Sequence, residues 1–195
     1  MWLTQTALIA TLMNQSITNL QMIRILGIDP GSRRTGYGVI DMAGANMNYV
    51  TSGIIRMSKG TLPERLQIIF DGLSQLIQEY KPQVMAIEEV FLARNPSAAL
   101  KLGQARGAAI LSGTNAQLPV SEYAAKSIKL AVVGTGAADK KQVQMMVTSL
   151  LKLPSEPSED AADGLAVAIC HGHSMRTQNI MAGVDVKGYS RGRLK

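Results

Sequence analysis

The chain has 195 residues, of which 46% are hydrophobic and 17% are charged. This length suits a single domain with a full core, and the composition excludes an intrinsically disordered chain. The net charge of +6 favours a polyanionic partner. Basic solvated tails produce the same excess, so the charge alone does not identify that partner.

The two ends of the chain differ from the part between them. Residues 7–13 are apolar, but this run is too short to cross a bilayer, and no Lys or Arg precedes it as in a secretory signal. We therefore expect residues 1–21 to be a mobile, dispensable extension, with Met22 as a natural start. Residues 176–195 carry five basic residues against one acid and predict a basic tail. Residues 22–175 remain as the folded domain.

Cys170 is the only cysteine, so no disulfide can form within the chain. A reducing cytoplasm is then the simplest location. His171 and His173 follow closely and raise the alternative of a metal site. One cysteine and two histidines in so short a run are more typical of a helix surface than of a ligand set.

A short apolar run predicts a buried strand that ends at Asp29. The run is bounded by a Pro-Gly turn and consists of Ile23, Ile25, Leu26 and Ile28, of which the isoleucines are β-branched. Packing does not explain a carboxylate at this place, because burying an unpaired charge is costly. A second strand begins near Tyr37, which predicts a hairpin. We expect Asp29 to bind a divalent metal.

The next segments predict a third strand, a helix and a fourth strand. Residues 48–55 have the pattern of a strand that closes a meander. Thr61 and Glu64 have the spacing of a capping box, and apolar residues then recur at helical intervals until Pro82 ends the helix. Residues 84–88 are again a short apolar run that ends in a carboxylate, Glu88.

A further helix is predicted to begin at Asn95 and Pro96, a cap followed by a first-turn proline. Ala99, Gly103 and Gly107 are spaced four residues apart and leave one face of this helix nearly bare. Such a face allows another backbone to come close. Packing on the sheet and a contact between subunits both remain open.

The last third of the chain predicts one strand and three helices. The strand covers residues 119–123, and a helix follows over residues 124–132. Asp139 caps the next helix, whose buried stripe consists of Val143, Met146, Val147 and Leu150. Lys140 lies at the start of this helix, where backbone N–H groups favour an anion.

A Pro-rich linker over residues 153–157 leads to the last helix, which begins near Ser158 and carries Asp160 and Asp163. These two carboxylates lie on one face, about one turn apart. Acids in a first turn also suit the helix dipole, and this structural role is the stronger alternative for Asp160. Asp163 lies deeper, among alanine, glycine and leucine, which favours a paired or metal-bound role.

The predicted elements form an α/β layout with a central mixed five-stranded sheet flanked by helices. A first strand ending in Asp, a later strand ending in Glu and a last helix with two Asp form the layout of ribonuclease H-like nucleases. Carboxylates gathered in one place repel one another and raise each other's pKa values. Divalent cations remove this conflict, and two such ions can support hydrolysis of a phosphodiester.

Four motifs extend the likeness beyond the fold. They are GIDPGSRRTGYG at residues 27–38, AIEEVF at 86–91, ALKLGQARG at 99–107 and DAAD at 160–163. Together, in this order, they resemble the RuvC family of Holliday junction resolvases. The resemblance runs from Met22 to about His173, and the basic ending RGRLK at 191–195 is also similar.

The resemblance implies an Mg²⁺-dependent endodeoxyribonuclease that resolves four-way DNA junctions in recombination and repair. It implies two Mg²⁺ ions, with Mn²⁺ as an alternative, a homodimer, and the RuvA–RuvB branch-migration complex as a partner. The matching catalytic metal ligands are Asp29, Glu88, Asp160 and Asp163. Phe91 matches an aromatic residue that stacks on a base, and Lys129 and Lys140 match residues that hold backbone phosphate. Residue patterns alone leave Phe91 as a core residue and the lysines as solvated ones.

Three other functions remain as alternatives. A sugar kinase or actin-like ATPase also places Asp after its first strand, but it needs two such lobes and a longer chain. A different nuclease of the same fold lacks the motifs beyond the carboxylates. A catalytically inactive ribonuclease H-like module that only binds nucleic acid is the main alternative, and the four acids argue against it.

Overall fold

The computed structural model describes residues 22–57, 59–90 and 96–183. The extension over residues 1–21, Phe91 and the end of the basic tail lie outside the described residues. Within the described ranges, no helix is long and apolar enough to span a membrane.

A mixed five-stranded sheet lies at the centre, as predicted, with strand order β3-β2-β1-β4-β5. β2 pairs antiparallel with both β1 and β3, whereas β1, β4 and β5 run parallel. The carboxyl ends of the parallel strands therefore meet at one edge of the sheet. The strands are β1 (Ile23–Asp29), β2 (Arg34–Ala43), β3 (Asn46–Arg56), β4 (Val84–Glu88) and β5 (Val120–Tyr123).

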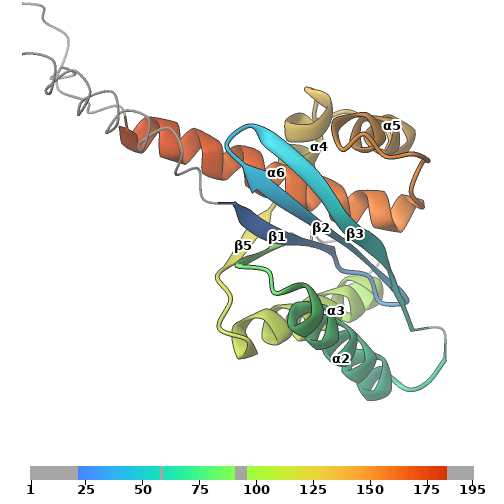
Figure 1. The fold of residues 1–195 in the computed structure, drawn as a ribbon. Coiled ribbons are helices and arrows are strands. Elements are labelled where there is room, and N and C mark those ends of the chain that lie inside the picture. Colours follow the sequence, from blue (N-terminus) through green and yellow to red (C-terminus); the bar gives the residue numbers. More distant parts are fainter. Residues whose placement is uncertain (1–21, 58, 91–95, 184–195) are drawn as a thin grey trace, which may run out of the picture.

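Helices cover both faces of the sheet (Figure 1). α2 (Leu62–Tyr80) and α3 (Pro96–Asn115) pack on one face around Leu26, Leu73 and Met85. α4 (Ala125–Val133), α5 (Lys140–Leu150) and α6 (Glu159–Gly183) cover the other face. α6 runs beyond position 175, so the first part of the sequence expected to form the basic tail is helical.

The helix starts agree with the capping signals in the sequence. The Thr61–Glu64 capping box is present at the start of α2. Asp139 accepts a hydrogen bond from the Gln142 amide at the start of α5. In the predicted α5 stripe, Val143 and Val147 are buried, and Met146 and Leu150 are partly buried.

The structure bears on two points about helix surfaces, the open alternatives for α3 and the expected exposure of His171. The bare face of α3 does not pack on the sheet at Gly103 or Gly107, because a Cβ atom on either would meet nothing within 4 Å. His171 is not on a helix surface: it is 5% exposed, and its Nδ1 lies 2.8 Å from the Tyr123 hydroxyl. The cause is that α6 is covered by β5 and the rest of the sheet along this stretch.

α6 packs against the β1–β2 hairpin at backbone distance. A Cβ atom on Gly27 would lie 2.3 Å from the Gly164 carbonyl oxygen and 2.4 Å from the Ala168 nitrogen. A Cβ atom on Gly36 would lie 1.8 Å from the Asp160 carbonyl oxygen. Only glycine at these positions allows the helix to lie so close to the strands.

Gly27→Ala is expected to lower the free energy of unfolding by about 1–3 kcal/mol, because the new methyl group overlaps backbone atoms that cannot move independently. Urea unfolding measures this change. Gly103→Ala is the matched control. In dilute, monomeric protein it is expected to raise the free energy of unfolding by about 0.5–1 kcal/mol, since its Cβ faces open space in a helix. Equal effects of the two substitutions would contradict the close contact of α6.

Candidate active site

Two carboxylates lie at the carboxyl edge of the parallel strands. β1 ends at Asp29 and β4 ends at Glu88. The two strands are hydrogen-bonded neighbours, with Ile28 opposite Ile87, so the two acids leave the sheet side by side. This edge is where open α/β sheets bind ligands.

α6 brings further acids to the same edge. Its first turns cross the end of the hairpin, and the Asp160 backbone lies directly over Gly36. Gly36 is in turn the β2 partner of Asp29. The close packing of α6 on the hairpin therefore sets how near the helix acids come to Asp29.

A cavity of about 310 Å³ lies at this edge of the sheet and is lined by most of the predicted site residues. Three predicted carboxylates line it, Asp29, Glu88 and Asp163, together with the predicted lysines Lys129 and Lys140. The rest of the lining is apolar and consists of Ala125, Ile128, Val143 and Ala166. Five of the seven site residues predicted from the sequence thus share one cavity.

Asp160 stands apart from that cavity. It does not line it, and its carboxylate accepts a hydrogen bond from Arg34 Nη1 at 3.4 Å. The pair is long and partly exposed, with 62% of the Arg34 side chain accessible, so it contributes little stability. The charge of Asp160 still raises the pKa of Asp29. Phe91, the remaining predicted residue, lies outside the described residues.

The three cavity carboxylates hold their protons more tightly than ordinary acids. Burial, followed by the charge of Glu88, raises the pKa of Asp29 to about 8. Burial, followed by the charge of Asp163, raises the pKa of Glu88 to about 7. Burial also raises the pKa of Asp163 to about 6, although Lys140 opposes this shift. The acids are close enough to repel and lack enough positive charge to compensate.

The two lysines supply part of that compensation. Lys129 lowers the pKa of Glu88 and of Asp163 by its charge. Lys140 donates a hydrogen bond to Glu159, and this bond, with the charges of Asp163 and Asp29, raises the pKa of Lys140. In the free protein Glu159 therefore holds Lys140 at the cavity, a role that the sequence patterns did not indicate.

The donor set suits a divalent cation of the Mg²⁺ type. Three carboxylates from β1, β4 and α6 offer hard oxygen ligands, and their mutual repulsion is relieved by a cation. Among the described residues, no three acids, cysteines or histidines already stand close enough to hold an ion.

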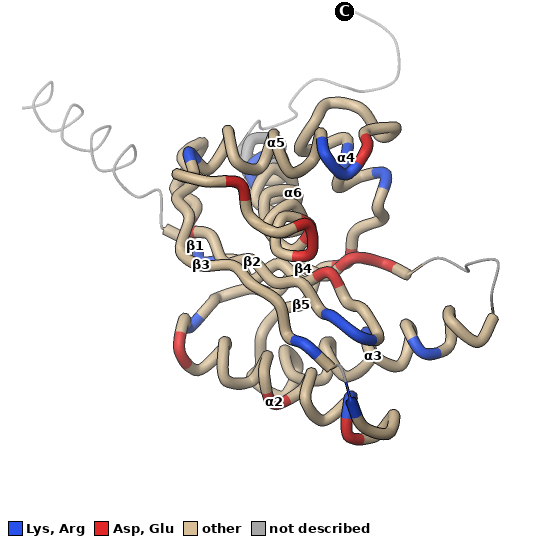
Figure 2. The backbone as a smooth tube through the Cα atoms, turned by 90° about the vertical axis from the view of Figure 1, so that its right-hand side faces the viewer, with Lys and Arg blue, Asp and Glu red and all other residues tan. Residues whose placement is uncertain are grey.

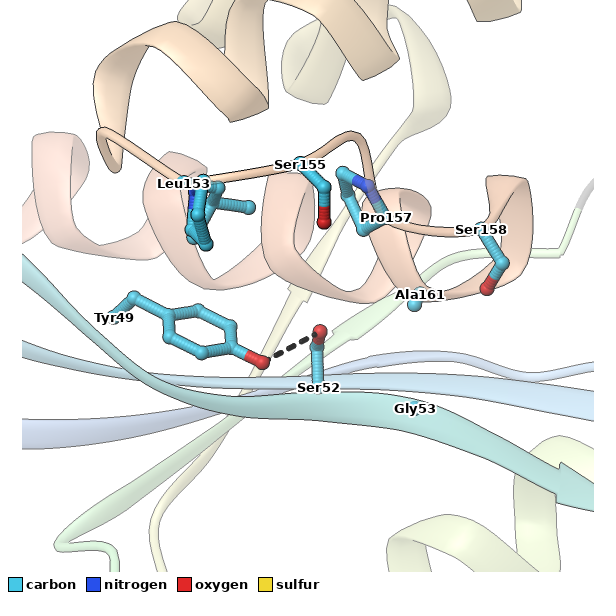
Figure 3. Close-up of a pocket in the computed structure, with 9 residues that line it drawn as sticks. Tyr49, Ser52, Gly53, Leu153, Ser155, Pro157, Ser158 and Ala161 are labelled. Carbon is cyan, nitrogen blue, oxygen red and sulfur yellow. Dashed lines mark hydrogen bonds between the residues drawn. The ribbon is translucent and has the colours of Figure 1, made fainter.

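A second cavity, of about 260 Å³, lies between β3 and the linker before α6 (Figure 3). The Tyr49 and Ser52 hydroxyl groups face each other there at 3.3 Å, and Ser155 and Ser158 lie on the linker side. Its lining contains no carboxylate, lysine, arginine or histidine. The carboxylate cavity is therefore the candidate active site.

Sequence reasoning missed Arg34 and Glu159, which pair with Asp160 and Lys140. Arg34 was visible inside the GIDPGSRRTGYG segment, but nothing local indicates that it reaches a residue 126 positions away. Glu159 resembled an ordinary first-turn acid. Both contacts depend on where α6 lies.

Comparison with known proteins shows the family of this chain. The sequence model of the family described as crossover junction endodeoxyribonuclease RuvC matches residues 25–171. A relative of that name from Tolumonas auensis is 58% identical over 174 residues, 89% of this chain and 100% of that protein. Another from Photobacterium profundum is 61% identical over 162 residues, 83% of this chain and 94% of that protein.

Solved structures give the same result. The structure of Thermus thermophilus RuvC in complex with a Holliday junction substrate has a TM-score of 0.75 at 30% identity, covering 80% of this chain and 96% of that one. The yeast mitochondrial Holliday junction resolvase Ydc2 shares the fold, with a TM-score of 0.57 at 12% identity over 83% of this chain and 86% of that one. The fold is thus that of the ribonuclease H-like resolvases. The chain belongs to the RuvC family, as its four motifs indicated.

The raised pKa values predict that stability falls as the pH rises when no metal is present. Asp29, Glu88 and Asp163 have folded pKa values of about 8, 7 and 6, above their ordinary values of 3.8, 4.5 and 3.8. The folded state therefore binds more protons, and its stability is lost as the pH rises through these folded values. The loss runs from about pH 4, near the ordinary values, to about pH 8, and with one pKa unit worth about 1.4 kcal/mol it amounts to several kcal/mol.

Urea unfolding at several pH values, with a chelator present, checks this expectation. Burial lowers the pKa of His171, which has the opposite effect on stability at acidic pH. Comparison with Asp29→Asn isolates the cavity, because that variant loses the largest shift and should depend less on pH. Asp71→Asn, an exposed substitution on α2, should behave as the wild type. An unchanged pH dependence in Asp29→Asn would show that Asp29 does not carry the predicted shift.

Proposed function

We propose that this chain is a metal-dependent crossover junction endodeoxyribonuclease that resolves four-way DNA junctions by symmetric hydrolysis of two strands. The observation that carries the proposal is the cavity shared by Asp29, Glu88, Asp163, Lys129 and Lys140. Membership of the RuvC family supplies the substrate class. A binding module without activity would have no reason to keep three repelling carboxylates in one cavity.

The carboxylates would hold two divalent ions, Mg²⁺ being the best match for hard oxygen ligands that keep several waters. When bound, such ions activate a water molecule and stabilise the leaving 3′ oxygen of an in-line displacement at phosphorus. Asp29, Glu88 and Asp163 would supply ligands from the cavity, and Asp160 would join them on leaving Arg34. Cation binding releases the protons that the raised pKa values retain at neutral pH.

The other residues of the cavity orient the substrate. Lys129 and Lys140 would bring positive charge to the phosphate beside the scissile bond, and Lys140 lies in the first turn of α5, where the helix dipole favours an anion. Ile128, Val143 and Ala166 exclude water from one side, which strengthens every electrostatic contact inside. We assign Phe91 to base stacking at the opened crossover, on the strength of its motif.

Symmetric cleavage requires two active sites, and the α3 surface is our proposed homodimer contact. Leu100 is 70% exposed and Leu111 58% exposed there, beside the open faces of Gly103 and Gly107. A groove between α2 and α3, also lined by Phe70, continues this surface. A second copy would bury these apolar groups.

By family likeness we further propose that the protein acts together with the RuvA–RuvB complex, in the cytoplasm.

Asp29→Asn is expected to abolish cleavage that depends on added Mg²⁺ while junction binding survives or tightens, because one repulsive charge is lost. Synthetic four-way, flap and linear duplex DNA, incubated with purified protein, provide the measurement. Wild type should place symmetric nicks in the four-way substrate alone. Asp71→Asn serves as the control and should cut normally. Near-normal cutting by Asp29→Asn would refute the metal assignment, and indifference to substrate would refute junction selectivity.

Leu111→Glu is expected to weaken the dimer at least tenfold, because a buried unpaired carboxylate costs more than about 1.4 kcal/mol at an interface. Sedimentation at several protein concentrations gives the dissociation constant. Leu130→Glu on α4 is the matched control, since Leu130 is 56% exposed and lies on the other face of the sheet. If the two variants dimerise equally well, the contact is not made by α3.

A further inference from the structure

Three exposed arginines gather where the β1–β2 turn meets the end of β3. Arg34 and Arg56 are direct cross-strand partners, so their side chains leave the same face of the sheet. Arg33 precedes Arg34, and its carbonyl oxygen accepts a hydrogen bond from the Met57 amide. Arg65 of α2 steadies the turn by donating from Nη1 to the Ser32 carbonyl. We call Arg33, Arg34 and Arg56 the arginine cluster.

The cluster is almost without neutralising partners. The other arginine in the described strands, Arg24, is paired with Asp41 at 2.7 Å. Within the described part of the chain, the side chains of Arg33 and Arg56 form no hydrogen bond or ion pair, and Arg34 reaches only Asp160, at 3.4 Å. Like charges placed directly opposite each other destabilise a sheet. Among the described residues, no strong ion pair offsets the repulsion between these arginines.

The cluster adjoins the catalytic edge. Arg34 lies two positions from Gly36, the strand partner of Asp29, a separation of about 7 Å along a strand. This is close to the axial rise of about two nucleotides in one DNA strand. In Figure 2 the blue positions at this end of β2 and β3 lie on the same side of the molecule as the red ends of β1, β4 and α6.

We propose that the arginine cluster is a phosphate-binding site that holds the cleaved DNA strand about two nucleotides from the scissile bond. The site rests on the proposed function and adds a second anchor, separate from Lys129 and Lys140. A guanidinium group matches phosphate with two parallel hydrogen bonds. Arg34 exchanges its weak contact with Asp160 for phosphate, which leaves the Asp160 carboxylate available at the cavity when DNA is in place.

The test measures binding without cleavage, in full-length Asp29→Asn protein, by fluorescence anisotropy of a labelled four-way junction across a range of salt concentrations. Arg56→Gln should weaken binding about tenfold and reduce the salt slope by about 0.9, because one phosphate contact is lost. The double variant Arg33→Gln with Arg56→Gln should lose about twice that slope.

Lys81→Gln is the matched control. Lys81 is exposed, follows α2 and lies near the start of β4, at the opposite edge from Glu88. Its loss removes the same charge and should leave the salt slope unchanged. If the arginine variants match Lys81→Gln in affinity and slope, the phosphate site is refuted.

Linear duplex DNA separates this result from the proposed function. Phosphate contacts do not depend on base sequence, so the arginine variants should lower the salt slope on linear DNA as well. A protein that binds junction and duplex equally would refute junction selectivity, while a lowered slope in the arginine variants would still support the cluster. Far-UV circular dichroism melting of each variant shows that the fold is retained.

Discussion

The close approach of α6 to the β1–β2 hairpin is the constraint on which the rest of the molecule depends. Glycines at positions 27 and 36 allow helix backbone to touch strand backbone. Asp29 ends the strand, and Asp160 and Asp163 belong to the helix. A wider helix–sheet distance would remove Asp163 from the cavity that Asp29 and Glu88 line. The packing of the core and the chemistry of the site therefore share one cause.

The buried carboxylates of the site repel one another in the free protein. Burial and mutual repulsion hold the pKa values of Asp29 and Glu88 near neutrality, while Lys129 and Lys140 compensate only partly. Outside the cavity the signs are reversed, because Arg33 and Arg56 have no acidic partner among the residues that the structure describes. In the complex that we propose, a divalent cation would relieve the first conflict and a phosphate strand the second. The free protein would then bear a cost that the substrate complex removes.

Local patterns were sufficient for most of the fold. The apolar run before Asp29, the Thr61–Glu64 box and the Asp139 cap each produced the element that they indicated, because caps and strand ends depend on neighbours in sequence. The burial of helix surfaces was harder to predict from the sequence. His171 proved buried beside Tyr123, since burial depends on which elements pack around a helix and not on its own composition.

The sequence by itself determined where the candidate carboxylates lie: Asp29 and Glu88 at strand ends, and Asp160 and Asp163 at a helix start. Only the tertiary structure decided how they divide, with Asp163 in the cavity and Asp160 held by Arg34. Residue type and spacing are properties of the chain, whereas separations of charges and their exclusion from water arise only after distant segments pack together. Those separations decide which acids repel and which acid has a guanidinium partner.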